Sequence, residues 1–308
     1  MINRPAAELI YTEICVVMPA YRSEGTIAEA IESVLTQNVH DVVVAVSLRV
    51  DDTATIDTVK SLADNRVRIF YQTGRGISNA RNIVLQSVFA DAFLFLDSDD
   101  TLNPGAIAAY RQAMEAEPAA GLFYGNWTAV VASGARLVEY HQVPYFTKST
   151  QRLRRSIALD NLVATSGTIL RGYVVREVGF FNEAYNHGED WEYWMRVLQK
   201  APFQKVKFDV ARYRHTKLAM IKSRSFWMVE ARIIDAAAGP KYNRFLAKLM
   251  VSGRYGIYYL RTLKSRRGSE LTDLTLGDLM LAVPAILFKI WRRYAYRLFG
   301  DQGFAPCL

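Results

Sequence analysis

Short apolar runs alternate with stretches of helical periodicity over the first 130 residues, and this alternation constrains the fold more than any other feature. Strand-like runs are expected at 14–18, 42–46, 67–71 and 92–96, and helical apolar spacing at 27–35, 56–62 and 78–89. Such alternation predicts an α/β fold with a mostly parallel sheet flanked by helices on both faces. Ligands of such sheets bind beyond the carboxyl ends of the strands.

The pattern from about residue 121 to 215 is more mixed. Short strands are expected near 122–124, 128–131 and 137–140, and one clear helix is expected from about Asp190. Beyond about residue 223 the sequence is helical in pattern, basic and aromatic. We therefore expect an α/β domain over residues 1–222 and a basic, aromatic helical extension over 223–308.

Two helix starts can be predicted from capping residues. Ser23 is expected to be the N-cap of the helix that carries Ile27 and Ile31. Asn103 is expected to cap a later helix, with Pro104 at its first helical position.

Charge and cysteine content limit the partners and the compartment. Residues 201–308 carry 20 Lys and Arg against 7 Asp and Glu, in a chain whose formal net charge is +8. This basic third indicates an anionic partner, with nucleic acid and acidic lipid as candidates. Cys15 and Cys307 are not placed for a disulfide framework or a zinc site, and no signal peptide is visible. A reducing, cytoplasmic setting is therefore expected.

The fourth strand-like run ends in Asp97-Ser98-Asp99-Asp100 and delivers three carboxylates within four residues to the rim of the sheet. Carboxylates this close repel one another unless a positive charge lies between them. A hard divalent cation, Mg²⁺ or Mn²⁺, would relieve the repulsion and would also bind a diphosphate. The alternative is an acidic turn that leads toward Pro104.

Four separated segments, in the expected order, resemble motifs of the family 2 glycosyltransferases, which have the GT-A fold. Asp97-Ser98-Asp99 looks like their Asp-x-Asp motif, and residues 16–21 (Val-Val-Met-Pro-Ala-Tyr) look like their opening strand and turn. Residues 76–82 look like their Gly-x-Ser-x-Ala-Arg-Asn segment, and Glu189-Asp190 resembles their Glu-Asp motif. The resemblance covers about residues 14–215. It implies a nucleotide-sugar half over about 1–130 and an acceptor half over about 131–222.

The resemblance implies a site for a nucleoside-diphosphate sugar, most simply a UDP-sugar. The residues that it places at the donor are Pro19, Ala20, Tyr21, Arg81, Asp97 and Ser98. Asp99, together with Asp97, would ligate Mn²⁺ or Mg²⁺. His215 lies where relatives often carry a His near the metal or the diphosphate, although a lone His is also common as a structural residue.

The sequence departs from the family after its second strand. The family usually has an Asp-Asp-Gly-Ser turn there, and its first acid reads the base. Here Arg49 occupies the turn, and the acids follow as Asp51 and Asp52. Either one of these acids takes over through a shifted loop, or base recognition differs.

The Glu189-Asp190 pair provides the second acidic site that the proposed chemistry needs. Inverting transfer is a single displacement in which an acceptor hydroxyl attacks the anomeric carbon, so a carboxylate must take the proton of the hydroxyl. Carried over from the family, Asp190 is this base and Glu189 orients the acceptor or the loop. The alternative is that both acids simply favour the first turn of a helix. Trp191 is a candidate for stacking on an acceptor sugar, whereas Trp194 and Val197 are expected in the core.

Residues 276–298 combine apolar, aromatic and basic residues. The uninterrupted apolar part, 279–288, is too short for a membrane span, which needs about 20 residues. The segment fits a helix that lies on a membrane surface. A helix packed on the catalytic domain, or a surface for self-association into a homo-oligomer, fits it as well.

The sequence as a whole predicts an inverting, metal-assisted glycosyltransferase. The resemblance implies an acceptor that is a bacterial surface polysaccharide or a lipid-linked oligosaccharide, and a cytoplasmic enzyme that could sit peripherally on the inner membrane face. A nucleotidyltransferase is an alternative, but residues 19–22 are not the glycine-rich loop that it needs. A non-catalytic scaffold that binds nucleic acid or membrane is another, although the aromatic and basic residues lie in a helical tail rather than on a sheet face. We therefore expect no nucleic-acid partner.

Overall fold

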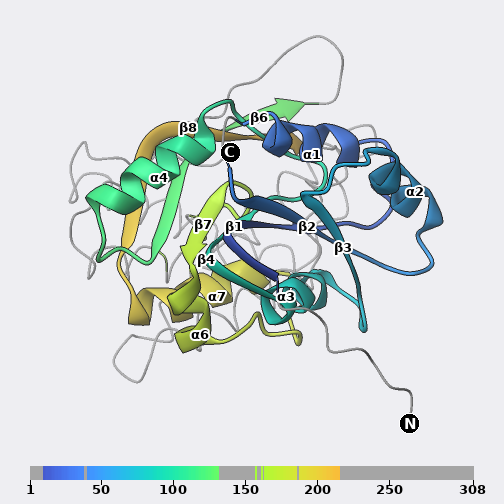
Figure 1. The fold of residues 1–308 in the computed structure, drawn as a ribbon. Coiled ribbons are helices and arrows are strands. Elements are labelled where there is room, and N and C mark those ends of the chain that lie inside the picture. Colours follow the sequence, from blue (N-terminus) through green and yellow to red (C-terminus); the bar gives the residue numbers. More distant parts are fainter. Residues whose placement is uncertain are drawn as a thin grey trace, which may run out of the picture.

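The computed structural model describes residues 10–37, 40–131, 157, 161, 163–185 and 187–215. They form one eight-stranded sheet with helices on both faces (Figure 1). The strands are β1 (Ile10–Pro19), β2 (Val42–Leu48), β3 (Val67–Tyr71), β4 (Val88–Phe95), β5 (Thr101–Leu102), β6 (Leu122–Val131), β7 (Thr168–Arg171) and β8 (Phe203–His215). The helices are α1 (Ile27–Leu35), α2 (Thr53–Ser61), α3 (Ile77–Ser87), α4 (Ala106–Ala116), α6 (Gly172–Val178) and α7 (Glu189–Lys200).

The first half of the sheet is parallel and has the order β3-β2-β1-β4. Val17 of β1 is paired with Ala45 on one side and with Phe95 on the other. Residues 14–18 are fully buried, as expected for a strand that is covered on both faces. The carboxyl ends of β1 and β4 therefore meet at one edge, where Pro19 and Asp97 lie close to each other in the fold.

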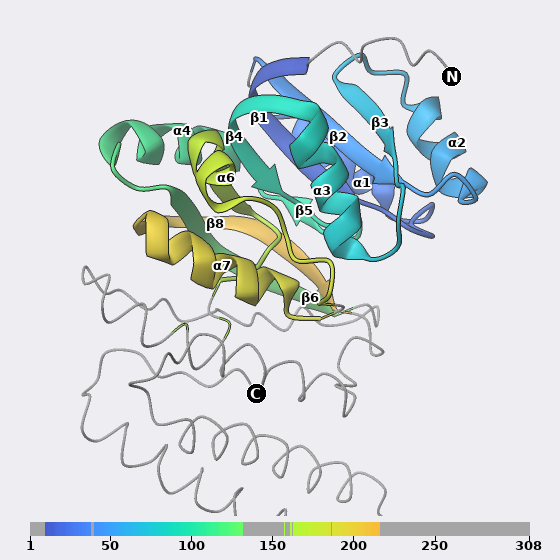
Figure 2. The same cartoon turned by 90° about the horizontal axis from the view of Figure 1, so that it is seen from below.

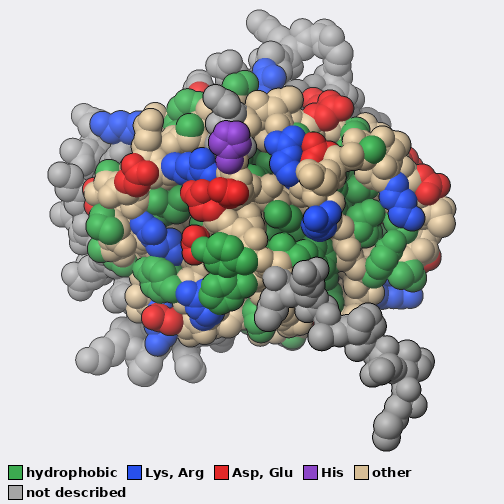
Figure 3. All heavy atoms as spheres, viewed as in Figure 1, with side chains coloured by type: hydrophobic (Ala, Val, Ile, Leu, Met, Phe, Trp, Pro, Cys, Tyr) green, Lys and Arg blue, Asp and Glu red, His purple; other side chains and the backbone are tan. Residues whose placement is uncertain are grey.

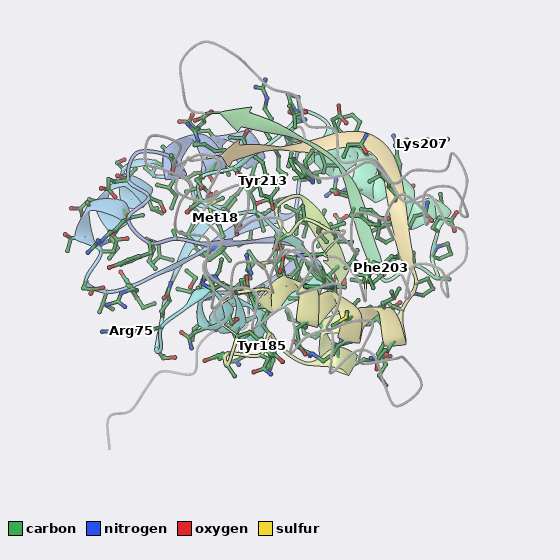
Figure 4. The ribbon with its side chains drawn as sticks, turned by 180° about the vertical axis from the view of Figure 1, so that it is seen from behind. Met18, Arg75, Tyr185, Phe203, Lys207 and Tyr213 are labelled. Carbon is green, nitrogen blue, oxygen red and sulfur yellow. The ribbon has the colours of Figure 1, made fainter. Side chains whose placement is uncertain are left out.

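The second half of the sheet is mixed. Strand β7 is antiparallel to both β4 and β6, and β8 is parallel to β6 and antiparallel to β5. Figure 4 shows that β8 rises from Phe203 to Lys207 and then bends toward Tyr213. Irregular register between β6 and β8 accompanies this bend. The bend brings the end of β8 back to the acidic segment that follows β4, where the backbone N–H of Arg214 reaches Asp100.

Two apolar layers flank the sheet, one for each set of helices (Figures 1 and 2). Helices α1, α2 and α4 cover the face to which Val16 and Met18 point. Helices α3, α6 and α7 cover the opposite face, to which Cys15 and Val17 point. This alternation along β1 follows from the two-residue repeat of a strand.

The structure confirms the predicted strand and helix order in the first 130 residues, with corrections at several boundaries. Residues 88–89 belong to β4 rather than to the preceding helix, and 122–124 and 128–131 form one strand. Residues 137–140, the extension over 223–308 and its segment 276–298 lie outside the described residues. The division at residue 222 therefore stays a prediction.

Both expected helix caps are wrong. The N-cap of α1 is Thr26, and the Ser23 hydroxyl contacts Ser98 Oγ at 2.8 Å instead of a helix N–H. Helix α4 begins at Ala106 after Gly105, whose φ of 85° suits glycine, and Asn103 Nδ2 donates to the backbone oxygen of Asp209. In both cases a contact with another element determines the side-chain position.

Acidic and basic side chains of the described residues are interspersed on the face shown in Figure 3. Most of the basic C-terminal third lies outside the described residues, so its expected anionic partner stays a prediction. Within the described part of the chain, no helix is long and apolar enough to cross a membrane.

Candidate active site

A cleft of about 390 Å³ opens where β1 and β4 end and α1 and α3 begin. Five of the residues singled out from the sequence line it, namely Pro19, Tyr21, Asp97, Ser98 and Asp99. The lining residues that sequence analysis missed are Arg22, Ser23, Thr26, Ile77 and Arg214. Ala20 does not line the cleft, because it is buried and its backbone N–H donates to Ser47 O at 2.9 Å.

The acidic segment after β4 is fixed by polar contacts from several elements. The backbone N–H of Asp97 donates to Ser166 Oγ at 2.9 Å. Asp99 is partly buried in the cleft, and its pKa is raised first by burial and then by the carboxylate of Asp97. Arg214 donates through Nε to the backbone oxygen of Asp99 at 3.1 Å. The segment thus presents two neighbouring carboxylates, Asp97 and Asp99, to one side of the cleft.

Asp100, the third acid of the segment, has a different position. Only 2% of its surface is exposed, and Oδ1 accepts the backbone N–H of Arg214 at 2.8 Å. Burial, followed by repulsion from Asp97, raises the pKa of Asp100 to about 8. Asp100 therefore connects the acidic segment to the end of β8 and does not line the cleft.

Asp97 and Asp99 fit a divalent cation site. Their oxygens are hard ligands, and repulsion between the two carboxylates contributes to the raised pKa of Asp99, so a cation would stabilise the pair. Among the described residues, no group of three or more His, Cys, Asp and Glu side chains could hold a metal. Mg²⁺ commonly uses one or two carboxylates and takes its other ligands from phosphates and water. The side chain of His215 lies outside the described ones.

The turn after β2 uses both of its acids for internal contacts. Asp51 is paired with Arg49 Nε and Nη2 at 2.8 and 2.6 Å. Asp52 is 7% exposed, and its Oδ2 accepts the backbone N–H of Arg22 at 2.6 Å. The guanidinium carbons of Arg22 and Arg49 lie 5.1 and 5.2 Å from the centre of the Tyr21 ring. Neither acid lines the cleft, so their expected contact with the base stays a prediction.

Arg81 of α3, which the resemblance places near the nucleotide, does not itself line the cleft but is paired with Asp97, which does. Its side chain is 1% exposed. Nη2 donates to Asp97 Oδ1 at 2.9 Å, and Nη1 donates to Glu189 Oε1 at 2.8 Å. Burial lowers the pKa of Arg81, but these two carboxylates more than offset it, so that Arg81 remains charged. One buried cation thus joins the two acidic motifs.

The Glu189-Asp190 pair begins α7 directly after Gly188, whose φ is 69°. Asp190 is partly exposed. Its Oδ2 accepts hydrogen bonds from Asn161 Nδ2 at 2.9 Å and from Thr165 Oγ1 at 2.8 Å. Burial raises the pKa of Glu189, and the Arg81 charge opposes this shift. The side chain of Glu189 therefore contacts Arg81, and Asp190 contacts the segment around Thr165.

Trp191 is not available for stacking on an acceptor sugar. Its side chain is 1% exposed, and its Nε1 donates to Ile157 O. The expected acceptor contact is therefore contradicted by the structure. Trp194 and Val197 are buried in the same core, as predicted.

The first turns of α3 also bind the loop before α7, which sequence analysis did not predict. Asn82 exchanges two hydrogen bonds with the backbone of Phe181, each of 2.9 Å. Asn79 and Asn82 both donate to the carboxylate of Glu183, at 3.2 and 2.9 Å. The available signal was the Asn-x-x-Asn spacing in the segment 76–82, which places both amides on one face of a helix.

The mostly parallel sheet with its antiparallel extension and flanking helices has the GT-A fold of solved glycosyltransferase structures. Residues 15–171 match the family Glycosyl transferase family 2. The chain therefore belongs to this family and is a glycosyltransferase.

Several known proteins are similar to the chain. An uncharacterized glycosyltransferase of Rickettsia felis is 22% identical over 61% of this chain and 32% of its own length. The succinoglycan biosynthesis protein ExoO of Rhizobium meliloti is 35% identical over 61% of this chain and 56% of its own length. The structure of S. aureus TarS residues 1–349 in complex with UDP-GlcNAc has a TM-score of 0.61 and 17% identity, covering 89% of this chain and 79% of that one. The chain spans about a third of the length of the first curated relatives that it matches.

Proposed function

We propose that this glycosyltransferase moves a sugar from a nucleoside-diphosphate sugar to an acceptor hydroxyl by a single displacement that inverts the anomeric centre. The observation that carries this proposal is the buried Arg81, whose two ion pairs bring the Asp97 and Glu189 segments into one site. A single displacement needs a leaving-group site and a base on opposite sides of the sugar. The sequence provides the two acidic segments, and the fold supports their pairing.

In this proposal the donor occupies the cleft beside Asp97 and Asp99. These carboxylates would hold Mn²⁺ or Mg²⁺, which stabilises the charge that develops on the departing diphosphate. Arg214 lines the same cleft and adds a positive charge on the diphosphate side. Tyr21 lines the cleft, and its ring, which two guanidinium groups contact, would stack on the base.

Asp190 is the proposed base. It takes the proton of the acceptor hydroxyl as the oxygen attacks the anomeric carbon, and this attack breaks the bond between that carbon and the diphosphate oxygen. Thr165 and Asn161 hold one carboxylate oxygen, so that the carboxylate is oriented in advance. Glu189 is buried against Arg81 and would orient the α7 start rather than contact the acceptor.

The relatives support a proposal for the donor and acceptor classes. TarS was solved with UDP-GlcNAc, and ExoO is named for succinoglycan biosynthesis. We infer by similarity that the donor is a nucleoside-diphosphate sugar, a UDP-sugar first, and that the acceptor is a growing polysaccharide or a lipid-linked oligosaccharide. A peripheral position on a membrane through residues 276–298 would bring the site to a lipid-linked acceptor.

The test is calorimetric titration of the purified protein with UDP, GDP, TDP and CDP, each with and without Mn²⁺. We expect one nucleotide to bind far more tightly with Mn²⁺ than without it. The bound nucleotide then selects the donors for transfer assays, in which a nucleoside diphosphate should be released. Release of pyrophosphate would identify a nucleotidyltransferase instead. If folded protein binds none of the four with Mn²⁺ present, the cleft is not a donor site.

A further inference from the structure

Arg81 connects two acidic segments of the protein and does not line the cleft. Its guanidinium reaches Asp97 through one terminal nitrogen and Glu189 through the other, and these two acids lie 16 and 108 residues away in the sequence. The Phe181 ring lies 5.3 Å from the guanidinium carbon. Nε is buried and has no hydrogen-bond partner within the part of the chain that the structure describes. Among the described residues, the two carboxylates accept the hydrogen bonds of this group, and the Phe181 ring packs against it.

We propose that Arg81 is a positioning residue. It fixes the start of α7, and with it Asp190, relative to Asp97, the carboxylate at the proposed sugar-donor site. The consequence of this inference for catalysis rests on the proposed function. The pairing of Arg81 with Asp97 and Glu189, here called the clamp, does not depend on any ligand. An arginine cannot lose its proton in a protein, so its buried charge always requires these two partners. Its planar fork also fixes the directions of both hydrogen bonds.

The two carboxylates share one cation, so a change at either one affects the other. When Glu189 is neutral, the whole guanidinium charge acts on Asp97 and competes more strongly with a metal for its oxygens. A metal bound to Asp97 would weaken the ion pair between Asp97 and Arg81. Arg81 would then interact more strongly with Glu189. Donor binding and the geometry of the base segment are therefore coupled through one residue.

Glu192 provides a matched control on the same helix. It is paired with Arg196 Nε at 2.7 Å in an i,i+4 ion pair, whereas the ion-pair partners of Arg81 are Asp97 and Glu189. Glu192→Gln therefore removes one carboxylate from α7 without changing the partners of Arg81. Any effect that is specific to the clamp should appear with Glu189→Gln and not with this control.

The first experiment measures the affinity for UDP with Mn²⁺ by calorimetry. We expect Glu189→Gln to weaken it roughly 3- to 30-fold, which lies within the range of coupling between residues of one network, and Glu192→Gln to leave it unchanged. In an Arg81→Lys background, a single ammonium group replaces the planar guanidinium group. Glu189→Gln should then weaken the affinity for UDP by less than about 2-fold. An equal effect of Glu189→Gln in both backgrounds, or no effect in the wild-type background, would overturn the coupling.

The second experiment needs no ligand and no change at Arg81. Urea unfolding midpoints are compared for Asp97→Asn, Glu189→Gln and the double variant. The first neutralisation leaves Arg81 one partner, and the second leaves its charge buried and unpaired. We therefore expect the urea midpoint of the double variant to fall by more than the sum of the decreases in the two single variants. Additive losses would show that Arg81 does not connect the two acids. If no nucleotide binds to the wild-type protein, the proposed function fails, and this second experiment alone decides the role of Arg81.

Discussion

Thr165 Oγ1 donates a hydrogen bond of 2.8 Å to Asp190 Oδ2, although the two residues are 25 positions apart in the sequence. Thr165 lies just before β7, and Asp190 lies in the first turn of α7. The backbone N–H of Trp191 reaches the other oxygen, Oδ1, at 2.7 Å. Both oxygens of the proposed base are therefore held by the protein itself, which fixes the carboxylate plane.

Replacement of Thr165 by Val should reduce the rate of transfer without loss of donor binding. The side chain keeps its size, but Asp190 loses one of the hydrogen bonds that orient it, so we expect kcat to fall about 10-fold. Steady-state kinetics, together with calorimetric UDP binding, measure the two effects separately. Thr168→Val is the control, because Thr168 is equally buried and its hydroxyl donates to Ala164 O instead. A matched fall in kcat for both variants would mean that Thr165 acts only through stability.

Replacement of Asp190 by Asn should abolish transfer and leave donor binding intact. The amide keeps the shape of the side chain but cannot take a proton, and loss of a general base typically costs about 10²- to 10⁴-fold in rate. The assay compares release of nucleoside diphosphate with and without acceptor. Transfer at the wild-type rate would show that another group is the base.

Replacement of Asp99 by Ala should remove the effect of metal on donor binding. We expect the affinity for UDP to be the same with and without Mn²⁺, because one of the two cleft carboxylates is lost. Calorimetry with both single ligands and their mixture measures this. Asp57→Ala, on the exposed side of α2, should keep the full Mn²⁺ dependence. An Asp99→Ala protein that still responds to Mn²⁺ would place the metal elsewhere.

Lys205 of β8 should make stability depend on pH in the alkaline range. Burial lowers its pKa from 10.5 to about 8, although Asp209 raises it in part. Between these two values the unfolded chain binds the proton and the folded chain does not, so the free energy of unfolding rises with pH. Below about pH 8 both states are protonated, and the cost of burying the charge is complete and constant.

Lys205→Met should therefore raise the free energy of unfolding at pH 7 by about 1–2 kcal/mol, less than the full shift because the amine is only partly shielded from water. Its advantage over the wild type should shrink as pH rises from 8 to 10.5. Urea titrations at several pH values measure both quantities. A constant difference between the two proteins across this range would mean that Lys205 does not titrate there.

Sequence reasoning succeeded where a local pattern decides the structure. The four parallel strands were predicted because β-branched apolar runs favour buried strands, and α7 was predicted because its apolar spacing follows a helix. The prediction for Trp191 failed for the same reason. Helical spacing shows which residues share a face, but only the packing of α7 against β4 and α6 shows that the face with Trp191 is buried.

The family, the parallel half of the sheet and the acids at its edge can be predicted from the sequence, because they follow from residue order and from short motifs. The group that each acid contacts depends on the tertiary structure. Arg81 is 108 residues from Glu189, and Asp100 is 114 residues from the backbone N–H that it binds. A buried charge is stable only beside partners that the rest of the fold brings to it. These partners are distant in the sequence, so no local pattern predicts the contact.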